Sequence, residues 1–173
     1  MPLKFTILGC GSSMGVPRPD GHWGNCDPKE RKNYRSRCSA MISNSYINIL
    51  FDTSPDLRSQ LIREKVKNVD KVFVPVQPSP VDLMATIPFL NLTKQERKKA
   101  VVILNRVMPR VRLTEAMILR LRYAGAKIAR TRISSKTIFA ETFSAGRGVV
   151  DISINSDASR EIINLGNEIL RNL

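Results

Sequence analysis

Segments with strand patterns and segments with helix patterns alternate along this sequence from residue 46 onward, and that alternation most restricts the possible fold. The runs 69–76 and 100–104 are typical of buried strands, whereas 81–92 and 114–123 carry helical apolar spacing. Parallel strands need a crossover segment, most often a helix, between them. The alternation therefore favours a largely parallel sheet in an α/β domain.

The front of the chain has a different pattern. A short strand at 4–8 is followed by a loop over 11–37 without hydrophobic periodicity, and the strand-like runs 38–42 and 46–51 flank a Ser-Asn-Ser turn. Asp52 then precedes a helix that Thr53 or Ser54 is expected to cap. The predicted fold is a single α/β domain with a mixed sheet, an N-terminal antiparallel hairpin and parallel βαβ units behind it.

Further local signals complete the prediction for the second half. Pro88 should kink or interrupt its helix, Thr114 should cap the helix that ends at Gly125, and residues 126–133 favour another strand. We also expect a short helix over 137–143 and a last helix capped by Ser156 or Asp157.

Composition indicates a soluble, cytoplasmic protein. The apolar content of 42% is normal for a globular domain, and no apolar run reaches the roughly 18 residues needed to cross a bilayer. Cys10, Cys26 and Cys38 are odd in number and widely spaced, so free thiols are expected. We expect no membrane association, and the sequence leaves the oligomeric state open.

The charge of the chain is strongly positive and unevenly placed. The net charge is +13, and the stretch 94–136 alone holds 13 Lys and Arg against Glu96 and Glu115, a local net charge of +11. Such a field attracts polyanions, of which nucleic acid is the candidate retained here, and a solvated basic face is the alternative.

The first 73 residues resemble the front of metallo-β-lactamase-fold hydrolases, in the branch related to phosphonate-pathway phosphodiesterases. The matching segments are FTILGCGSS (5–13), GVPR (15–18), RCS (37–39) and ILFDTSPDLR (49–58). In that family, the strand that corresponds to residues 69–74 leads into a His-x-His-x-Asp-His cluster that binds the catalytic metals.

This chain departs from the family at that cluster. Residues 75–78 read Pro-Val-Gln-Pro there, and His22 is the one histidine of the sequence. A hydrolytic metal pair needs several imidazole and carboxylate ligands, so the sequence predicts that family-type hydrolysis is absent.

The remaining residues, 74–173, resemble the carboxyl-terminal half of ParA-type partition ATPases. The similarity is carried by VPVQPSPVDL (74–83), ILNRV (103–107), TRI (131–133) and FAE (139–141). The phosphate-binding loop of that family belongs to the upstream half, and this chain contains no Gly-Lys dipeptide from which to build one. Without a phosphate cradle and its metal, ATP hydrolysis is not expected.

The ParA resemblance also implies candidate binding residues. Asn105 matches the position that contacts the adenine edge, as a vestigial nucleotide contact, and a structural polar residue at a strand end is the alternative. Relatives bind DNA without sequence specificity through basic residues in this half. The matching residues are Arg106, Arg110, Arg112, Arg120, Arg122, Lys127, Arg130, Arg132 and Lys136.

Three other patterns are weighed and set aside as sites. Gly9-Cys10-Gly11 with Gly15 has the wrong spacing for a dinucleotide loop. His22, Cys26 and Cys38, with Cys10 as a fourth candidate ligand, are too irregularly spaced for a closed zinc site. Asp52 and Asp56 are paired acids, but the end of a strand and the first turn of a helix explain them without catalysis.

The sequence thus predicts a non-catalytic fusion remnant without cofactors, in which a truncated metallo-β-lactamase-like segment (1–73) joins a truncated ParA-like segment (74–173). One alternative is a bacterial partition-type protein with weak, salt-sensitive, non-specific DNA binding. A second alternative is a phosphodiesterase-like hydrolase in name only.

Overall fold

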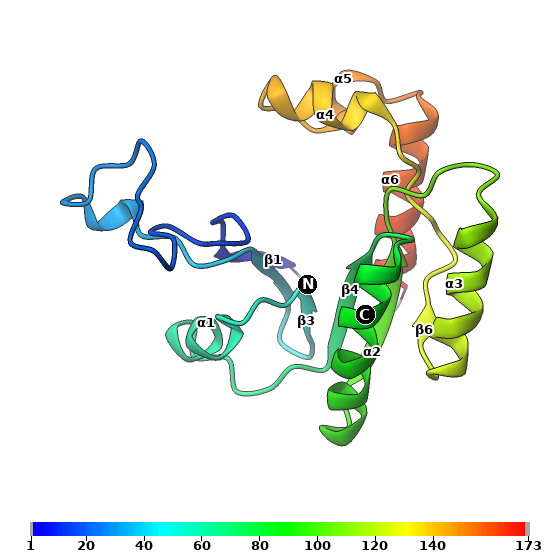
Figure 1. Ribbon diagram of the computed structural model, residues 1–173, viewed down its shortest axis with the longest axis horizontal. Helices are drawn as coiled ribbons and strands as arrows, with labels where there is room; N and C mark the ends of the chain where they lie inside the picture. Colours follow the sequence, from blue (N-terminus) through cyan, green and yellow to red (C-terminus); the bar gives the residue numbers. More distant parts are fainter. Residues whose placement is uncertain (1, 172–173) are drawn as a thin grey trace. The chain divides into compact units, whose positions relative to one another are not determined.

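The computed structural model describes residues 2–171, which form six strands, six α-helices and one short 3-10 helix. The strands are β1 (Lys4–Gly9), β2 (Ser39–Ser43), β3 (Asn48–Phe51), β4 (Lys71–Val76), β5 (Lys99–Leu104) and β6 (Lys127–Ile128). The helices are η1 (Arg31–Asn33), α1 (Leu57–Arg63), α2 (Pro80–Gln95), α3 (Arg112–Tyr123), α4 (Thr137–Ser144), α5 (Val149–Ile152) and α6 (Asp157–Leu170) (Figure 1).

The sheet is mixed, as predicted from the sequence. Its strand order is β1-β2-β3-β4-β5-β6, with antiparallel pairing of β1 to β2 and of β2 to β3 and parallel pairing of β3 to β4 and of β5 to β6. The chain divides into two compact units with the boundary between Val74 and Pro75, inside β4. This boundary falls where the two resemblances were expected to join, and the assignment of each unit to a parent family stays a prediction.

The first unit is organised around β1, β2, β3 and the front of β4. Its buried side chains include Leu8, Ile49 and Phe73, and the Phe73 ring stacks on Phe51 at a centroid distance of 5.3 Å. Gly9 is required by packing, because an added Cβ would lie 2.1 Å from the carbonyl oxygen of Arg37.

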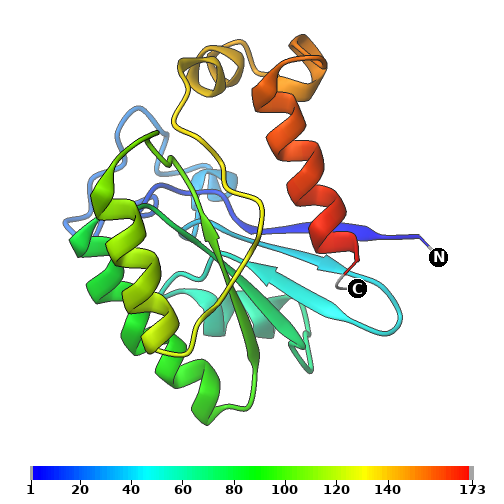
Figure 2. The same cartoon turned by 90° about the vertical axis from the view of Figure 1, so that its right-hand side faces the viewer.

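The second unit is a small α/β layer structure. Figure 2 shows α2 and α3 side by side on one face of β5 and α6 on the opposite face. Val102, Leu104 and Leu121 are almost fully buried between these layers. None of the helices in residues 2–171 is long and apolar enough to cross a membrane.

Two sequence expectations for helices were wrong. Pro88 does not interrupt α2, which runs from Pro80 to Gln95. Pro88 and Met84 are both exposed, so the Met84 carbonyl that loses its helical donor lies on the solvent side, where water can replace it. Thr114 is buried within α3, and Val111 occupies the N-cap without a side-chain hydrogen bond.

The front helix and the last strand also differ from expectation. Asp56, rather than Thr53 or Ser54, is the N-cap residue of α1. Strand β6 is restricted to Lys127–Ile128, because the N–H groups of Arg130, Thr131 and Ser134 beyond it donate to carboxylates of α6. The cap at Ser156 is confirmed, since its Oγ accepts a hydrogen bond from the Ser159 N–H.

Candidate nucleic-acid interface

The basic residues predicted to bind DNA begin at the carboxyl end of β5. The Asn105 N–H donates to the Val76 carbonyl at 2.9 Å, and its side-chain Oδ1 accepts from the Arg106 N–H at 2.9 Å. The amide oxygen of Asn105 is therefore engaged in ordering its own loop. This geometry matches the alternative of a structural polar residue, and a nucleotide contact by Asn105 stays a prediction.

The loop from β5 to α3 projects arginines outward. Arg106 and Arg110 adopt positive φ angles of 53° and 61°, a conformation uncommon for residues with a Cβ. Both side chains are exposed. The loop is held in place by hydrogen bonds of 2.9 Å from the Val107 N–H to the Ile133 carbonyl and from the Ser135 N–H to the Val107 carbonyl.

Three arginines gather around one cavity at this loop, which we call the arginine cavity. It has a volume of about 350 Å³, and Arg110, Arg112 and Arg132 line it together with Glu115 and the loop residues 107–111. Glu115 is the one carboxylate in the lining, and it pairs with Arg132 at 2.9 Å. Arg110 and Arg112 therefore give the cavity a net positive charge.

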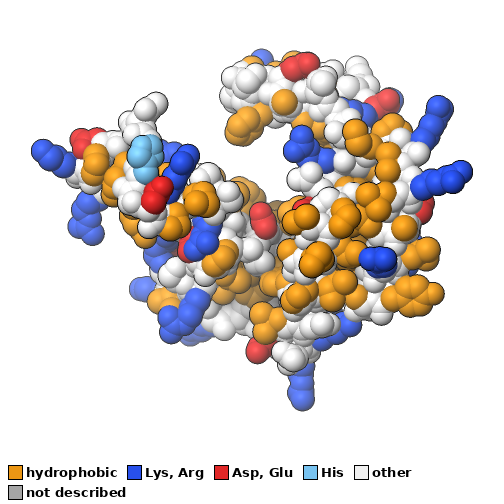
Figure 3. Space-filling view, viewed as in Figure 1, with side chains coloured by type: hydrophobic (Ala, Val, Ile, Leu, Met, Phe, Trp, Pro, Cys, Tyr) orange, Lys and Arg blue, Asp and Glu red, His pale blue; other side chains and the backbone are white. Residues whose placement is uncertain are grey.

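The other predicted contacts are distributed rather than gathered. Arg120 and Arg122 are exposed in the last turn of α3, where cations also interact favourably with the helix dipole. Figure 3 shows Lys and Arg side chains projecting from the side of the molecule on which α3 lies. Lys136 is half-buried and paired with Glu161 at 2.9 Å, so its charge is largely compensated within the unit.

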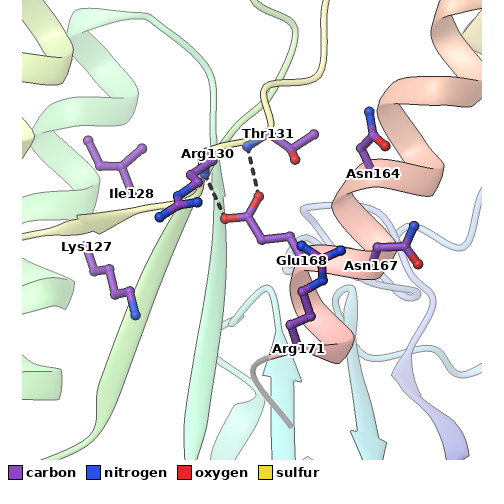
Figure 4. A pocket seen from close by; sticks show the side chains of 8 residues that line it. All are labelled: Lys127, Ile128, Arg130, Thr131, Asn164, Asn167, Glu168 and Arg171. Atoms are coloured by element: carbon purple, nitrogen blue, oxygen red, sulfur yellow. Dashed lines mark hydrogen bonds between the residues drawn. The ribbon is translucent and has the colours of Figure 1, made fainter.

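Lys127 and Arg130 lie at a second, larger cavity. Its volume is about 600 Å³, and Asn164, Asn167 and Arg171, from α6 and its end, also line it (Figure 4). These three residues were not among the sequence candidates. Their spacing along the chain gives no signal, because only the packing of α6 against the segment after β6 brings them there.

Two glutamates of α6 organise the segment beside this cavity. Glu168 accepts hydrogen bonds from the N–H groups of Arg130 and Thr131 at 2.8 and 2.9 Å. Burial disfavours the charged form of Glu168, but these N–H donors outweigh it and lower the pKa of the carboxyl. The pKa of Glu161 is lowered for the same kind of reason, with Ser134 and Lys136 outweighing desolvation.

The first unit contains a separate cavity near the paired acids. Ser13, Arg37, Cys38 and residues 52–55 line about 470 Å³. Desolvation raises the pKa of Asp52, whereas hydrogen bonds from the Arg37 side chain and backbone lower that of Asp56. Asp56 accepts from the Arg37 N–H at 2.8 Å and from its guanidinium at 2.7 and 3.1 Å. Asp56 thus anchors the long loop to α1.

The candidate zinc ligands are not brought together. Within residues 2–171, no group of three or more His, Cys, Asp and Glu side chains is placed to hold a metal ion. His22 instead accepts a hydrogen bond from the Gly24 N–H through its Nδ1, at 3.2 Å, within an exposed turn.

Two curated proteins resemble this chain in part, while no protein-family model matches it. The "Maintenance of carboxysome distribution protein A" of Halothiobacillus neapolitanus is 25% identical over 128 residues, which is 70% of this chain and 59% of that protein. An octanoyltransferase of Porphyromonas gingivalis is 33% identical over 73 residues, 42% of this chain and 15% of that protein. The chain spans less than two thirds of either protein.

Solved ATPases and a solved diphosphatase also resemble this chain in part. The cell division ATPase MinD of Pyrococcus furiosus matches with a TM-score of 0.54 and 16% identity, over 70% of this chain and 49% of that one, which is a likeness of fold. A ParA family ATPase of Chlorobium tepidum has a TM-score of 0.49 at 21% identity and covers 62% of this chain and 43% of that one. A diphosphatase of the PhnP family has a TM-score of 0.39 at 27% identity, over 74% and 49%. That this chain joins the two families stays a prediction.

Proposed function

We propose that residues 75–173 bind double-stranded DNA without reading its sequence, in a partition-type role that involves no catalysis. The observation that carries this proposal is the arginine cavity, where Arg110 and Arg112 have no carboxylate partner among the contacts described above and Glu115 is already paired with Arg132. Guanidinium groups bind phosphate oxygens as hydrogen-bonded ion pairs. Neutralising phosphates releases counterions and requires no base contact.

The comparisons with known proteins also support a partition-type role. The carboxysome distribution protein, by its name, maintains the distribution of a cellular body, and it resembles this chain over 128 residues. The MinD likeness supports the fold on which such a role would rest. A binding role also agrees with the sequence, which has a single histidine and no Gly-Lys dipeptide.

A salt-dependent titration tests DNA binding. The anisotropy of a labelled duplex of random sequence should rise with added protein, and the affinity should fall steeply between about 50 and 200 mM salt. The double variant Arg110→Ala/Arg112→Ala should flatten the slope of log K against log salt by about 0.9 for each phosphate that the variant no longer neutralises.

A matched control distinguishes DNA binding by the arginine cavity from an effect of the net charge of the chain. Arg18→Ala/Arg58→Ala removes the same charge from exposed positions of the first unit and should leave the slope nearly unchanged. Equal losses in both double variants would show that net charge, and not the arginine cavity, provides the affinity. An affinity that is insensitive to salt would contradict the proposal altogether.

A second candidate is a non-catalytic fusion remnant with no binding role. The exposed apolar surface of α2 favours it, because Val81 and Met84 are 75% and 76% exposed. Figure 3 shows apolar side chains gathered in this region. A helix that covers a sheet in a larger α/β protein often has a neighbour over such residues, so an uncovered face is consistent with a missing layer.

Two measurements test the remnant hypothesis. It predicts no salt-dependent DNA binding, and no turnover of a generic phosphodiester with added Mn²⁺. Turnover that a chelator abolishes would instead support the hydrolase alternative.

A cooperative thermal transition followed by circular dichroism is expected under the DNA-binding proposal, since the arginine cavity requires a folded second unit.

A further inference from the structure

Cys10 directly follows β1, which ends at Gly9, and Cys38 directly precedes β2, which begins at Ser39. Gly9 pairs with Ser39 in the antiparallel ladder after a register shift between Ile7 and Gly9, and Gly11 forms an isolated parallel bridge with Arg37 just beyond it. Cys10 lies between the two glycines, and Cys38 lies between their two partners. The two cysteines are therefore close neighbours at the strand ends.

The pairing of their chain neighbours brings the two cysteines near enough for a covalent link to be considered. A disulfide spans Cα atoms about 4.4–6.8 Å apart, a range that includes neighbouring residues on paired strands. The close approach of the two strands is fixed by Gly9, since any side chain there would collide with the Arg37 carbonyl. The strands cannot move apart without losing the hydrogen bond of 2.8 Å from the Gly11 N–H to the Ser36 carbonyl.

Both sulfur atoms are accessible and close enough to influence one another. Cys10 and Cys38 are free and exposed, whereas Cys26 is half-buried within the loop. Desolvation raises the pKa of the Cys38 thiol, and the nearby Asp52 and Cys10 raise it further. The electrostatic influence of Cys10 on Cys38 reflects this proximity.

We propose that Cys10 and Cys38 form a reversible disulfide that closes the loop 11–37 at its base, with a small-molecule disulfide such as oxidised glutathione as the oxidant. One cysteine thiolate attacks a sulfur of oxidised glutathione, which forms a mixed disulfide and releases one glutathione thiolate. The second cysteine thiolate attacks the protein sulfur of that mixed disulfide and releases the other glutathione. Two protein thiols are oxidised, and one glutathione disulfide is reduced to two thiols.

The test uses the full chain incubated with oxidised glutathione and then alkylated. Trypsin together with an aspartate-specific protease separates the three cysteines into peptides 5–19, 20–26 and 38–51, because the bond between Arg18 and Pro19 resists trypsin. The expected product is a linked pair of peptides 5–19 and 38–51, lighter than the sum of the reduced peptides by two hydrogen atoms. Dithiothreitol should restore both free peptides.

Single substitutions provide the controls. Cys26→Ser should keep the link, while Cys10→Ser and Cys38→Ser should each abolish it and leave a glutathione adduct on the remaining partner. The proposal is overturned by a link that includes peptide 20–26, by disulfide-linked dimers in place of the internal link, or by three free thiols after complete oxidation of the glutathione pool. The peptide map of the unsubstituted chain decides the matter even if a variant fails to fold.

Discussion

Glu161 on α6 binds both hydrogen-bond donors of Ser134, with its Oε2 2.9 Å from the Ser134 N–H and its Oε1 2.7 Å from the hydroxyl. The same carboxylate pairs with Lys136 at 2.9 Å. One side chain of the last helix therefore fixes the irregular segment that precedes α4.

We expect Glu161→Gln to destabilise the protein at pH 7 by about 1–3 kcal/mol, because an amide cannot accept from all three donors and removes the charge opposite Lys136. The folded pKa of Glu161 lies below its ordinary value of 4.5. Its contribution is therefore complete above that pH and is lost as the pH falls through the folded pKa. Denaturant unfolding of both proteins across pH 3–7 measures this difference.

Glu141→Gln is a suitable control for that experiment. Glu141 is exposed on α4, so its substitution should change the free energy of unfolding by no more than about 0.5 kcal/mol. If Glu161→Gln and the parent protein differ by the same amount at pH 3 and pH 7, the carboxylate charge is not the stabilising feature.

Asp56→Asn should loosen the attachment of the long loop to α1. The guanidinium of Arg37 binds the Asp56 carboxylate at two points, and the geometry is lost when one oxygen becomes an amide. The melting temperature should fall by a few degrees, and Arg37→Lys should cause a smaller fall because it keeps the charge but not the paired contacts. An identical melting temperature for both variants and the parent would mean that the loop is held by other contacts.

Asp52→Asn should have the opposite effect. Desolvation raises the pKa of Asp52 above its ordinary value of 3.8, so the charged carboxylate opposes folding at neutral pH. Asparagine removes that cost, tolerates the positive φ of 58° at this position and retains an acceptor for the Thr53 N–H. Because Asp52 is exposed and solvent screens its charge, the stability gain at pH 7 should be smaller than about 0.5 kcal/mol, and it should disappear as the pH falls below 3.8.

The Asp52 substitution should also change the reactivity of Cys38. Asp52 contributes, after desolvation, to the raised pKa of the Cys38 thiol. In a Cys10→Ser/Cys26→Ser background, Asp52→Asn should therefore speed the alkylation of Cys38 by iodoacetamide near neutral pH. An unchanged rate would show that desolvation alone governs this thiol.

Two glycine substitutions should change the stability of the protein in opposite directions. Gly166→Ala in α6 should stabilise the protein by about 0.5–1 kcal/mol, because the added methyl meets open space and alanine has the higher helix propensity. Gly9→Ala should destabilise it by about 1–3 kcal/mol or more, since its Cβ would overlap the Arg37 carbonyl. Thermal melts of the two variants beside the parent protein check both signs.

The order and type of the regular elements were largely predictable from the sequence. The apolar run at Val101 and Val102 predicted a buried strand, and Ser156 predicted the start of α6, because both depend on local chemistry. The N-cap of α1 was missed because Asp56 is engaged by Arg37, a residue far away in sequence. Tertiary contacts of this kind leave no local pattern.

The candidate interface was predictable only as a charged region. The sequence identified the basic residues, but it gave no means to distinguish Arg110 and Arg112, which line a cavity beside a single carboxylate, from Lys136, which Glu161 neutralises. It also gave no indication that Arg171 would lie near Arg130. These distinctions depend on how α6 packs, and helix packing follows from three-dimensional complementarity more than from residue spacing.

The carboxylates of α6 affect how readily a second chain can pair with this edge of the sheet. Strand β6 is the last in the sheet order. An outermost strand has unpaired backbone N–H and C=O groups with which a strand of another chain can form hydrogen bonds. Beyond β6, the N–H groups of Arg130, Thr131 and Ser134 already donate to Glu168 and Glu161. An incoming strand would have to displace two charged acceptors, so α6 obstructs strand addition along residues 130–134.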